Sequence, residues 1–190
     1  LEIEEAFYRV AFSQNRNFIN AKNVVNVLVT GAFFSIAPEK SKLALILLDI
    51  LSKGRVAQVK LDRYQFLHGF GALLLQHPEI GDWETNFLHD LGAFISFGGK
   101  GRIMLDYGFT ENQELEIVED EIALVPAPSK QKIEVTIMDK EKQRFTLHGG
   151  SYGVLLDGRV KPLKLAFGRF DSREAMKRWS SAIEKVEMIE

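Results

Sequence analysis

The first half of the chain alternates between segments with the apolar spacing of helices and segments with that of strands. "VVNVLVT" (24–30) is rich in β-branched residues and apolar at almost every position, which predicts a strand covered on both faces. Residues 39–53 carry only a narrow polar stripe and predict a mostly buried helix. Residues 55–62 predict a second strand, and residues 63–76 predict a second buried helix. This order predicts an α/β layer with parallel strands and right-handed crossovers.

The second half changes to a period of two, the pattern of half-buried strands. Apolar and polar residues alternate over 114–120, 132–139 and 144–150, which predicts antiparallel strands. Asp157-Gly158 is a dipeptide typical of a tight hairpin turn. These features predict a small antiparallel β barrel or sandwich.

A helix is expected to close the β-rich half. Asp171 or Ser172 is a suitable N-cap, and the apolar residues that follow share one helical face. That face comprises Ala175, Met176, Trp179, Ala182, Ile183 and Val186. The glycines of residues 98–101 predict a hinge, so we expect an α/β part over residues 1–97 and a β-rich part with a terminal helix over residues 98–190.

Composition and charge exclude several classes of function. A formal net charge of −2 over 190 residues gives no reason to expect electrostatic binding of nucleic acid or of a membrane surface. The absence of cysteine excludes disulfides and thiolate metal sites, and it fits a reducing, cytoplasmic location. No apolar run approaches the roughly 18 residues of a membrane span. Because the chain begins at Leu1 without an initiator Met, we expect it to be a piece of a longer protein.

The end of the first predicted strand is the strongest candidate for a binding site. In Thr30-Gly31-Ala32 the glycine permits a positive φ and lets a ligand approach the main chain without meeting a Cβ atom. Ligands usually bind at this end of the strands in open α/β sheets. A tight turn without a ligand is the alternative interpretation. Asp62, at the end of the second strand, predicts either a helix cap or a polar group for a ligand hydroxyl.

No catalytic or metal-binding constellation is expected within this chain. The histidines at 68, 77, 89 and 148 lack the helical spacing of paired metal ligands, and no cysteine is present as a nucleophile. Gly69 and Gly71 interrupt the second helix, where each costs about 1 kcal/mol relative to alanine. They therefore predict close packing of that helix against a strand or a ligand.

Two stretches resemble the C-terminal part of the glutamate mutase L-like proteins (MutL or GlmL), which belong to the actin–hexokinase–Hsp70 ATPase superfamily. The first is "VLVTGAFFSIAPEKSKLALILLDIL" followed by "VKLDRYQFLHGFGALLL". The second is "GGSYGVLLDGRVKPL" (149–163), with the helix that ends near Trp179. The resemblance implies that the α/β half is part of an actin-like ATPase layer.

It also implies a function. Thr30, Gly31 and Ala32 match a motif that contacts the adenosine of a bound nucleotide, with ATP and Mg²⁺ as the ligands expected of the full-length protein. The phosphate-binding motifs of the superfamily lie in its N-terminal half, so this chain alone is not expected to be catalytic. Members of the family are accessory, reactivating chaperone-like ATPases for adenosylcobalamin-dependent mutases. The implied partner is such a mutase or the remainder of its own chain.

One departure from the family pattern motivates an alternative. Ala32 stands where the family usually has a second glycine, and its Cβ narrows the approach to the main chain. The alternative function is a non-catalytic protein–protein assembly module in which the nucleotide site is degraded.

Overall fold

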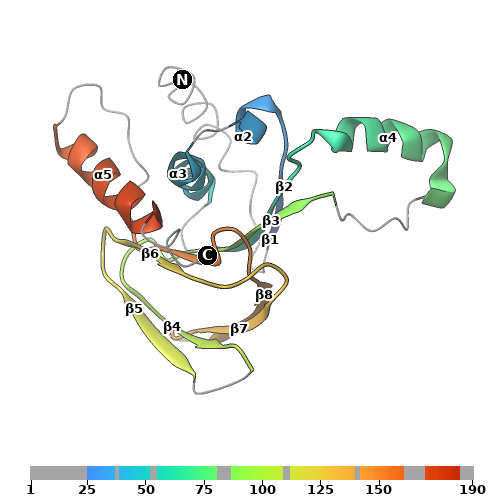
Figure 1. The fold of residues 1–190 in the computed structure, drawn as a ribbon. Coiled ribbons are helices and arrows are strands. Elements are labelled where there is room, and N and C mark those ends of the chain that lie inside the picture. The colour runs from blue at the N-terminus through green and yellow to red at the C-terminus, as the bar shows by residue number, and fades with distance from the viewer. Residues whose placement is uncertain are drawn as a thin grey trace.

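The computed structural model is a mixed α/β protein with two sheets (Figure 1). It describes residues 25–36, 39–51, 55–80, 87–108, 112–139, 142–160 and 170–184. Ile3, Ala6, Phe7, Val10 and Ala11 recur at a spacing that predicts a helix, and this segment lies outside the described residues. In chain order the elements are β1 (Val25–Val29), α2 (Ala32–Ile36), α3 (Lys40–Ile50), β2 (Arg55–Leu61), α4 (Phe66–Gln76), the 3₁₀ helix η2 (Pro78–Ile80), β3 (His89–Ser96), β4 (Gly101–Asp106), β5 (Gln113–Ile117), β6 (Ile122–Val125), β7 (Lys132–Ile137), β8 (Gln143–His148), β9 (Val154–Asp157) and α5 (Phe170–Glu184).

The larger sheet has five strands in the order β1-β2-β3-β9-β6. β1 and β2 are parallel, with Val27 opposite Val59, which confirms the parallel pairing predicted for the first two strands. β3 is antiparallel to β2 and parallel to β9, with Ala93 opposite Val154. Strands from both sides of the expected boundary at residue 97 therefore belong to one sheet.

The smaller sheet contains four antiparallel strands in the order β5-β4-β7-β8. Three of them are the strands predicted over 114–120, 132–139 and 144–150, and their antiparallel pairing is confirmed. The sheet packs against one face of the larger sheet, while α3 and α5 lie over the opposite face (Figure 1). The described strands form two open sheets and no closed barrel.

Two apolar cores result from these three layers. Phe94 and Leu155 belong to the core beneath α3 and α5, whereas their neighbours Ile95 and Leu156 belong to the core between the sheets. This alternation follows from the strand geometry, in which successive side chains point to opposite faces. All four side chains are 0% exposed, so β3 and β9 are covered on both sides.

Helix α3 confirms the buried helix predicted over 39–53, because its residues from Leu43 to Leu48 are all buried. Helix α5 confirms the terminal helix, and Trp179 and Ile183 are buried as predicted. Val186 lies outside the described residues.

The prediction of a buried second helix is wrong. None of the residues of α4 is buried, although the helix carries no charged side chain. Figure 1 shows α4 extending away from both sheets at the end of β2. Helix α4 has the apolar composition of a core helix, but no sheet or helix layer among the described residues covers it.

The hairpin expected at Asp157-Gly158 is also wrong. β9 ends at Asp157, and its antiparallel partner is β6, which precedes it by more than twenty residues in the chain. The carboxylate of Asp157 turns back instead and accepts hydrogen bonds from the backbone N–H and the Nε of Arg159.

Candidate functional site

The carboxyl ends of β1 and β2 lie side by side, because these strands are parallel and Val29 pairs with Leu61. The backbone N–H of Asp62 donates to the carbonyl of Val29 at 2.8 Å and extends the pairing beyond the strands. The Thr30 hydroxyl donates to Oδ2 of Asp62 at 3.1 Å. The structure thus brings together two of the residues singled out in the sequence, 32 positions apart.

The Asp62 carboxylate is fully buried and caps the first amides of α4 from outside the helix, whose N-cap residue is Gln65. Its Oδ1 accepts from the backbone N–H of Phe66 at 2.8 Å, and its Oδ2 accepts from that of Leu67 at 2.9 Å. Burial by itself raises the pKa of Asp62, but the hydrogen bonds from Leu67, Phe66 and Thr30 outweigh it and place the pKa below its ordinary value. Of the two roles predicted for Asp62, the structure shows the cap.

Gly31 leaves the main chain open at this edge. Its φ is +115°, a conformation that residues with a Cβ rarely adopt, and no atom of the described residues lies within 4 Å of the position that a Cβ would take. The hydroxyl of Ser35 donates to the Gly31 carbonyl at 3.1 Å and closes the turn into α2. Ala32, the first residue of α2, is exposed. A planar or apolar group can therefore approach the backbone at Gly31 from solvent.

Gly69 and Gly71 do not belong to this edge. No atom of the described residues lies within 4 Å of the Cβ position at either glycine, so the predicted packing against a strand is wrong within these residues. The alternative, packing against a ligand, stays a prediction. Both glycines instead lie in the exposed helix α4.

Residues 149–153 form a G-x-S-x-G motif, a possible catalytic pattern that the sequence analysis does not include. Its serine, Ser151, lies 2.6 Å from Nε2 of His89, and both residues are exposed. Every backbone N–H from Gly149 to Gly153 already donates to a carbonyl oxygen, so the loop has no free donor for an oxyanion. The motif also joins two strands, β8 and β9, whereas a nucleophile elbow leads from a strand into a helix.

The glycines of this motif have a packing role. A Cβ on Gly150 would lie 2.5 Å from the carbonyl oxygen of Asp90, a backbone atom that cannot move independently of β3. The loop is therefore a close backbone junction between β3 and the β8–β9 connection, and the pair of Ser151 and His89 lies on its surface.

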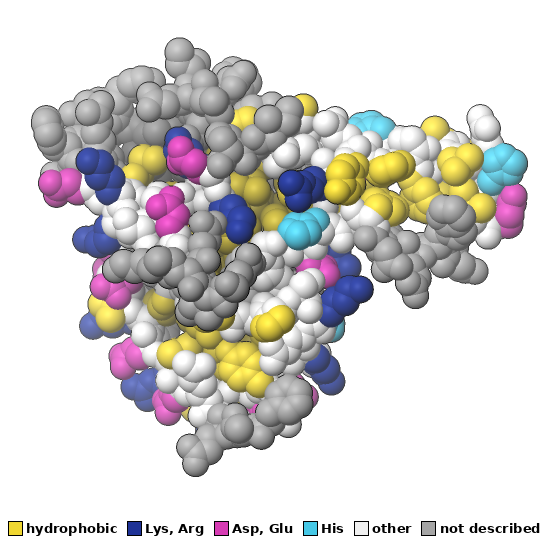
Figure 2. Space-filling model, viewed as in Figure 1, with side chains coloured by type: hydrophobic (Ala, Val, Ile, Leu, Met, Phe, Trp, Pro, Cys, Tyr) yellow, Lys and Arg dark blue, Asp and Glu magenta, His cyan; other side chains and the backbone are white. Residues whose placement is uncertain are grey.

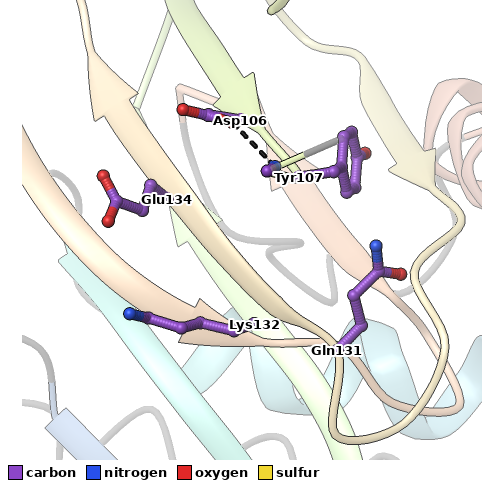
Figure 3. Close-up of a pocket in the computed structure, with 6 residues that line it drawn as sticks. Asp106, Tyr107, Gln131, Lys132 and Glu134 are labelled. Carbon is purple, nitrogen blue, oxygen red and sulfur yellow. Dashed lines mark hydrogen bonds between the residues drawn. The ribbon is translucent and has the colours of Figure 1, made fainter. Parts of the chain in front are cut away.

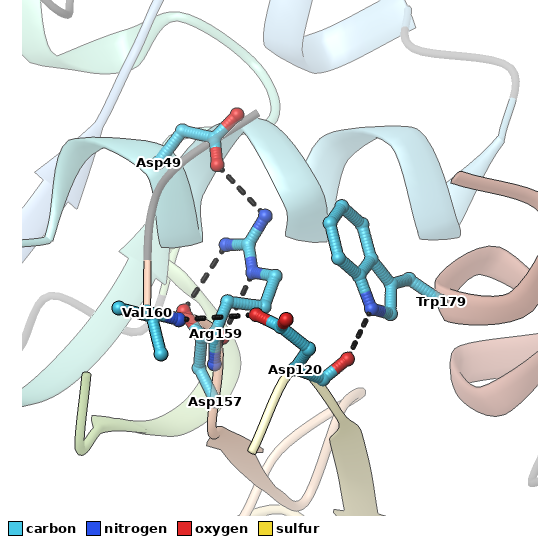
Figure 4. Close-up of polar contacts among 6 residues, drawn as sticks. All are labelled: Asp49, Asp120, Asp157, Arg159, Val160 and Trp179. Carbon is cyan, nitrogen blue, oxygen red and sulfur yellow. Dashed lines mark hydrogen bonds and ion pairs between the residues drawn. The ribbon is translucent and has the colours of Figure 1, made fainter. Parts of the chain in front are cut away.

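A buried charge cluster holds α3, α5 and the end of β9 together (Figure 4). Arg159 donates to Asp49 through Nη1 at 2.9 Å and to Asp157 through Nε at 2.8 Å. The side chain of Arg159 is 2% exposed, and its guanidinium carbon lies 5.0 Å from the centre of the Trp179 ring. Burial by itself lowers the pKa of Arg159, but the carboxylates of Asp157 and Asp49 raise it above the ordinary value. The side chain is a permanent buried cation that joins three elements.

The described residues also form a surface pocket beside the end of β4 and the start of β7 (Figure 3). It is lined by Asp106, Tyr107, Gly108, Gln131, Lys132 and Glu134. Burial raises the pKa of the Tyr107 hydroxyl, and Oδ1 of Asp106 accepts from the backbone N–H of Gly108 at 2.8 Å. None of the binding-site residues predicted from the sequence lines this pocket.

Within the described part of the chain, no group of three or more histidine, aspartate and glutamate side chains is placed to hold a metal ion. No helix in the same part is both long and apolar enough to cross a bilayer. Comparisons of the chain with protein-family models, with curated proteins and with solved structures find no match.

Proposed function

We propose that this chain is the C-terminal region of an accessory, chaperone-like ATPase of the glutamate mutase L type. In this proposal the Thr30-Gly31-Ala32 edge supplies the adenosine side of a nucleotide cleft, and the protein services an adenosylcobalamin-dependent mutase. The observation that carries the proposal is the open main chain at Gly31, at the carboxyl end of a parallel strand pair. Ligands of open α/β sheets bind at that end of the strands.

In this proposal each residue of the strand edge has a separate role in binding the nucleotide. Gly31 lets the flat adenosine ring approach the backbone, and the exposed Ala32 borders the same approach. The Thr30 hydroxyl donates to Asp62 and keeps oxygen lone pairs for a ligand donor. Asp62 is fully buried and acts as a positioning residue, because both of its oxygens are occupied by Thr30 and α4.

In this proposal the described residues supply only the adenosine side of the site, and among them no group of three or more histidine, aspartate and glutamate side chains is placed to hold Mg²⁺. In this proposal Mg²⁺ enters with the ATP phosphates and is held by other parts of the full-length protein. The chain taken alone binds one side of the nucleotide and hydrolyses nothing.

Thermal unfolding with and without Mg-ATP tests the proposal on the longest natural chain that contains this segment. ATP at 100 times its dissociation constant is expected to stabilise the protein by about 2.7 kcal/mol. Ala32→Leu fills the approach without the backbone strain that any substitution at Gly31 brings, and it should abolish the shift. Ala72→Leu, an exposed alanine in α4, is the matched control and should retain it. No shift in the wild-type protein would reject the nucleotide site.

One observation favours a second candidate function, a non-catalytic assembly module. Helix α4 exposes large apolar side chains, and isolated apolar patches of that kind mark contact surfaces. A protein partner, either a mutase or the remainder of the same chain, would cover them. This candidate predicts no nucleotide-dependent shift and a stable complex with a purified mutase. A monodisperse protein that binds neither ATP nor the mutase would reject this second candidate function.

A further inference from the structure

The hydrogen bonds of the smaller sheet are interrupted where β4 turns away from β7. The pairing of these strands ends at Asp106, which lies opposite Glu134. Gly108 has a φ of +77°, and its N–H donates to Oδ1 of Asp106 at 2.8 Å, so the chain after β4 leaves the side of β7. β7 itself extends two residues further than the pairing, to Lys132.

The backbone groups of Lys132 face the side from which β4 has turned away. Lys132 lies opposite His148 of β8, but the N–H and C=O of His148 bond to the side chain of Gln58, at 2.9 and 3.1 Å. Lys132 and His148 are therefore a non-hydrogen-bonded pair, and the N–H and C=O of Lys132 point away from β8. Met138, at the same alternation, donates to the carbonyl of Arg102 at 2.8 Å, which confirms this direction.

Among the described residues, no group on the β4 side is hydrogen-bonded to the backbone N–H or C=O of Lys132. Both groups lie at the surface pocket shown in Figure 3, which Lys132 helps to line. The volume of the pocket is about 410 Å³, within the range of about 300–1,000 Å³ typical of small-molecule sites. The pocket therefore presents a backbone donor and a backbone acceptor side by side.

The side chains divide the pocket into an uncharged side and a charged side. Figure 3 shows Tyr107 and Gln131 together on one side of β7, and Lys132 and Glu134 on the other. The Tyr107 ring packs against the core between the sheets and offers a flat apolar wall. Because burial raises the pKa of Tyr107, its hydroxyl stays neutral near neutral pH. The Gln131 side chain adds an amide, so the uncharged side suits a neutral and flat ligand.

We propose that this pocket binds a small planar lactam, a ring that carries an N–H donor beside a carbonyl acceptor, as uracil does. The ligand takes the place of the missing strand neighbour, because the Lys132 N–H donates to its carbonyl and the Lys132 C=O accepts from its ring N–H. The Tyr107 ring lies against the flat face of the ligand. The proposal is independent of nucleotide binding at Gly31.

The geometry favours a lactam over a peptide strand. An added strand would form its next pair with Lys130, but Lys130 has a φ of +68° and is not extended. Only one residue of β7 is therefore free to pair at this place. A ring amide is cis, so its N–H and C=O lie on the same edge, whereas those of a trans peptide bond point in opposite directions.

Titration of isotope-labelled protein with uracil, followed by NMR, tests the proposal. We expect a saturable shift of the Lys132 amide signal and no shift of the Gly31 amide, which separates this pocket from the proposed adenosine edge. Dimethyluracil, methylated on both ring nitrogens, keeps the ring and both carbonyls but has no N–H, and it should bind at least several-fold more weakly. No saturable shift of Lys132 up to the solubility limit of uracil, or equal affinity for both probes, would overturn the proposal.

Two substitutions at one position separate the backbone of Lys132 from its side chain. Lys132→Ala keeps the N–H and should bind uracil with the affinity of the wild type. Lys132→Pro removes the N–H at the first residue of a strand, where proline is tolerated, and should lose uracil binding at an unchanged melting temperature. Equal uracil affinity of these two variants would overturn the proposal.

Tyr107→Leu tests the aromatic wall and keeps the proposal falsifiable if Lys132→Pro does not fold. It should weaken uracil binding several-fold, whereas Tyr64→Leu, at a tyrosine that is 68% exposed and outside the pocket, should not. Unchanged binding by Tyr107→Leu would overturn the proposal.

Amide hydrogen exchange tests the premise that the Lys132 N–H lacks a partner. It should exchange much faster than the Glu134 N–H, which takes part in the pairing with Asp106, and saturating uracil should slow it several-fold. Equal protection of the two amides without uracil would overturn the proposal.

Discussion

Replacement of Arg159 by methionine gives the most direct test of how the layers are held together. The substitution keeps an unbranched side chain but removes the cation between Asp49 and Asp157, whose side chains are 9% and 4% exposed. Removing one partner of a buried ion pair typically costs 3–5 kcal/mol, because a buried charge loses its compensation. Here the loss includes the contact of the guanidinium with Trp179. We therefore expect a loss of about 4 kcal/mol, a large part of the 5–15 kcal/mol that holds a typical domain together.

Urea unfolding followed by tryptophan fluorescence measures this loss. At a slope of about 2 kcal/mol/M, a loss of about 4 kcal/mol lowers the midpoint by about 2 M. The chain has two tryptophans, and Trp83 lies outside the described residues. In a Trp83→Phe background the buried Trp179 becomes the only reporter, and it lies in contact with the substituted residue.

Arg102→Met is the control for the loss of an arginine as such. Arg102 is 53% exposed and pairs with Glu114 and Glu116 across the surface of the smaller sheet. Exposed ion pairs contribute about 0.2–1 kcal/mol, so this variant should lose less than 1 kcal/mol. If Arg159→Met loses no more than Arg102→Met, the buried cluster does not hold α3, β9 and α5 together, and the reasoning is refuted.

Three further substitutions test the site and the loops. Asp62→Asn should lower the free energy of unfolding by about 1–2 kcal/mol at pH 7. Because the folded-state pKa of Asp62 is depressed, this loss is complete above the ordinary pKa of about 3.8 and shrinks as the pH falls through the folded-state value. Equal differences in urea midpoint between variant and wild type at pH 7 and at pH 3 would contradict the capping role. Gly150→Ala should lose about 1–3 kcal/mol by thermal unfolding, since its Cβ would meet the backbone of β3. Gly71→Ala, where the space is open, should instead stabilise dilute protein by up to about 1 kcal/mol, and a loss would show that α4 is packed there.

The elements predicted best from the sequence are those whose pattern depends on few other parts of the chain. β1 is rich in valine, β2 carries Val56, Val59 and Leu61 at strand-like spacing, and α3 between them is mostly apolar. The type and parallel order of these elements therefore follow from local pattern and from the handedness of crossovers. The meeting of Thr30 with Asp62 follows in turn, because the ends of parallel neighbours share one edge of the sheet.

The elements and roles that could not be predicted from the sequence depend on tertiary contacts. β3 and β9 are buried on both faces, so they lack the alternation that identifies a strand. The sequence of α4 predicts a helix, but its apolar pattern does not indicate which other part of a protein covers that helix. The role of Asp62 likewise depends on the turn before α4, where Gln65 adopts a φ of +58° and brings the amides of Phe66 and Leu67 onto the carboxylate.

Asp62 connects the strand edge to the start of α4. Its Oδ2 accepts from the Thr30 hydroxyl on one side and from the Leu67 amide on the other, so the position of Thr30 and the start of α4 are held by the same buried atom. A ligand that donates to the Thr30 oxygen changes the hydrogen bond that this hydroxyl gives to the buried Asp62 carboxylate. The same carboxylate accepts from the first amides of α4. Occupancy of the edge and the orientation of α4 should therefore be coupled, and linkage requires the coupling to be reciprocal. Thr30→Val removes the shared donor, so it should reduce any effect of Mg-ATP on the hydrogen exchange of the first backbone amides of α4, measured by mass spectrometry.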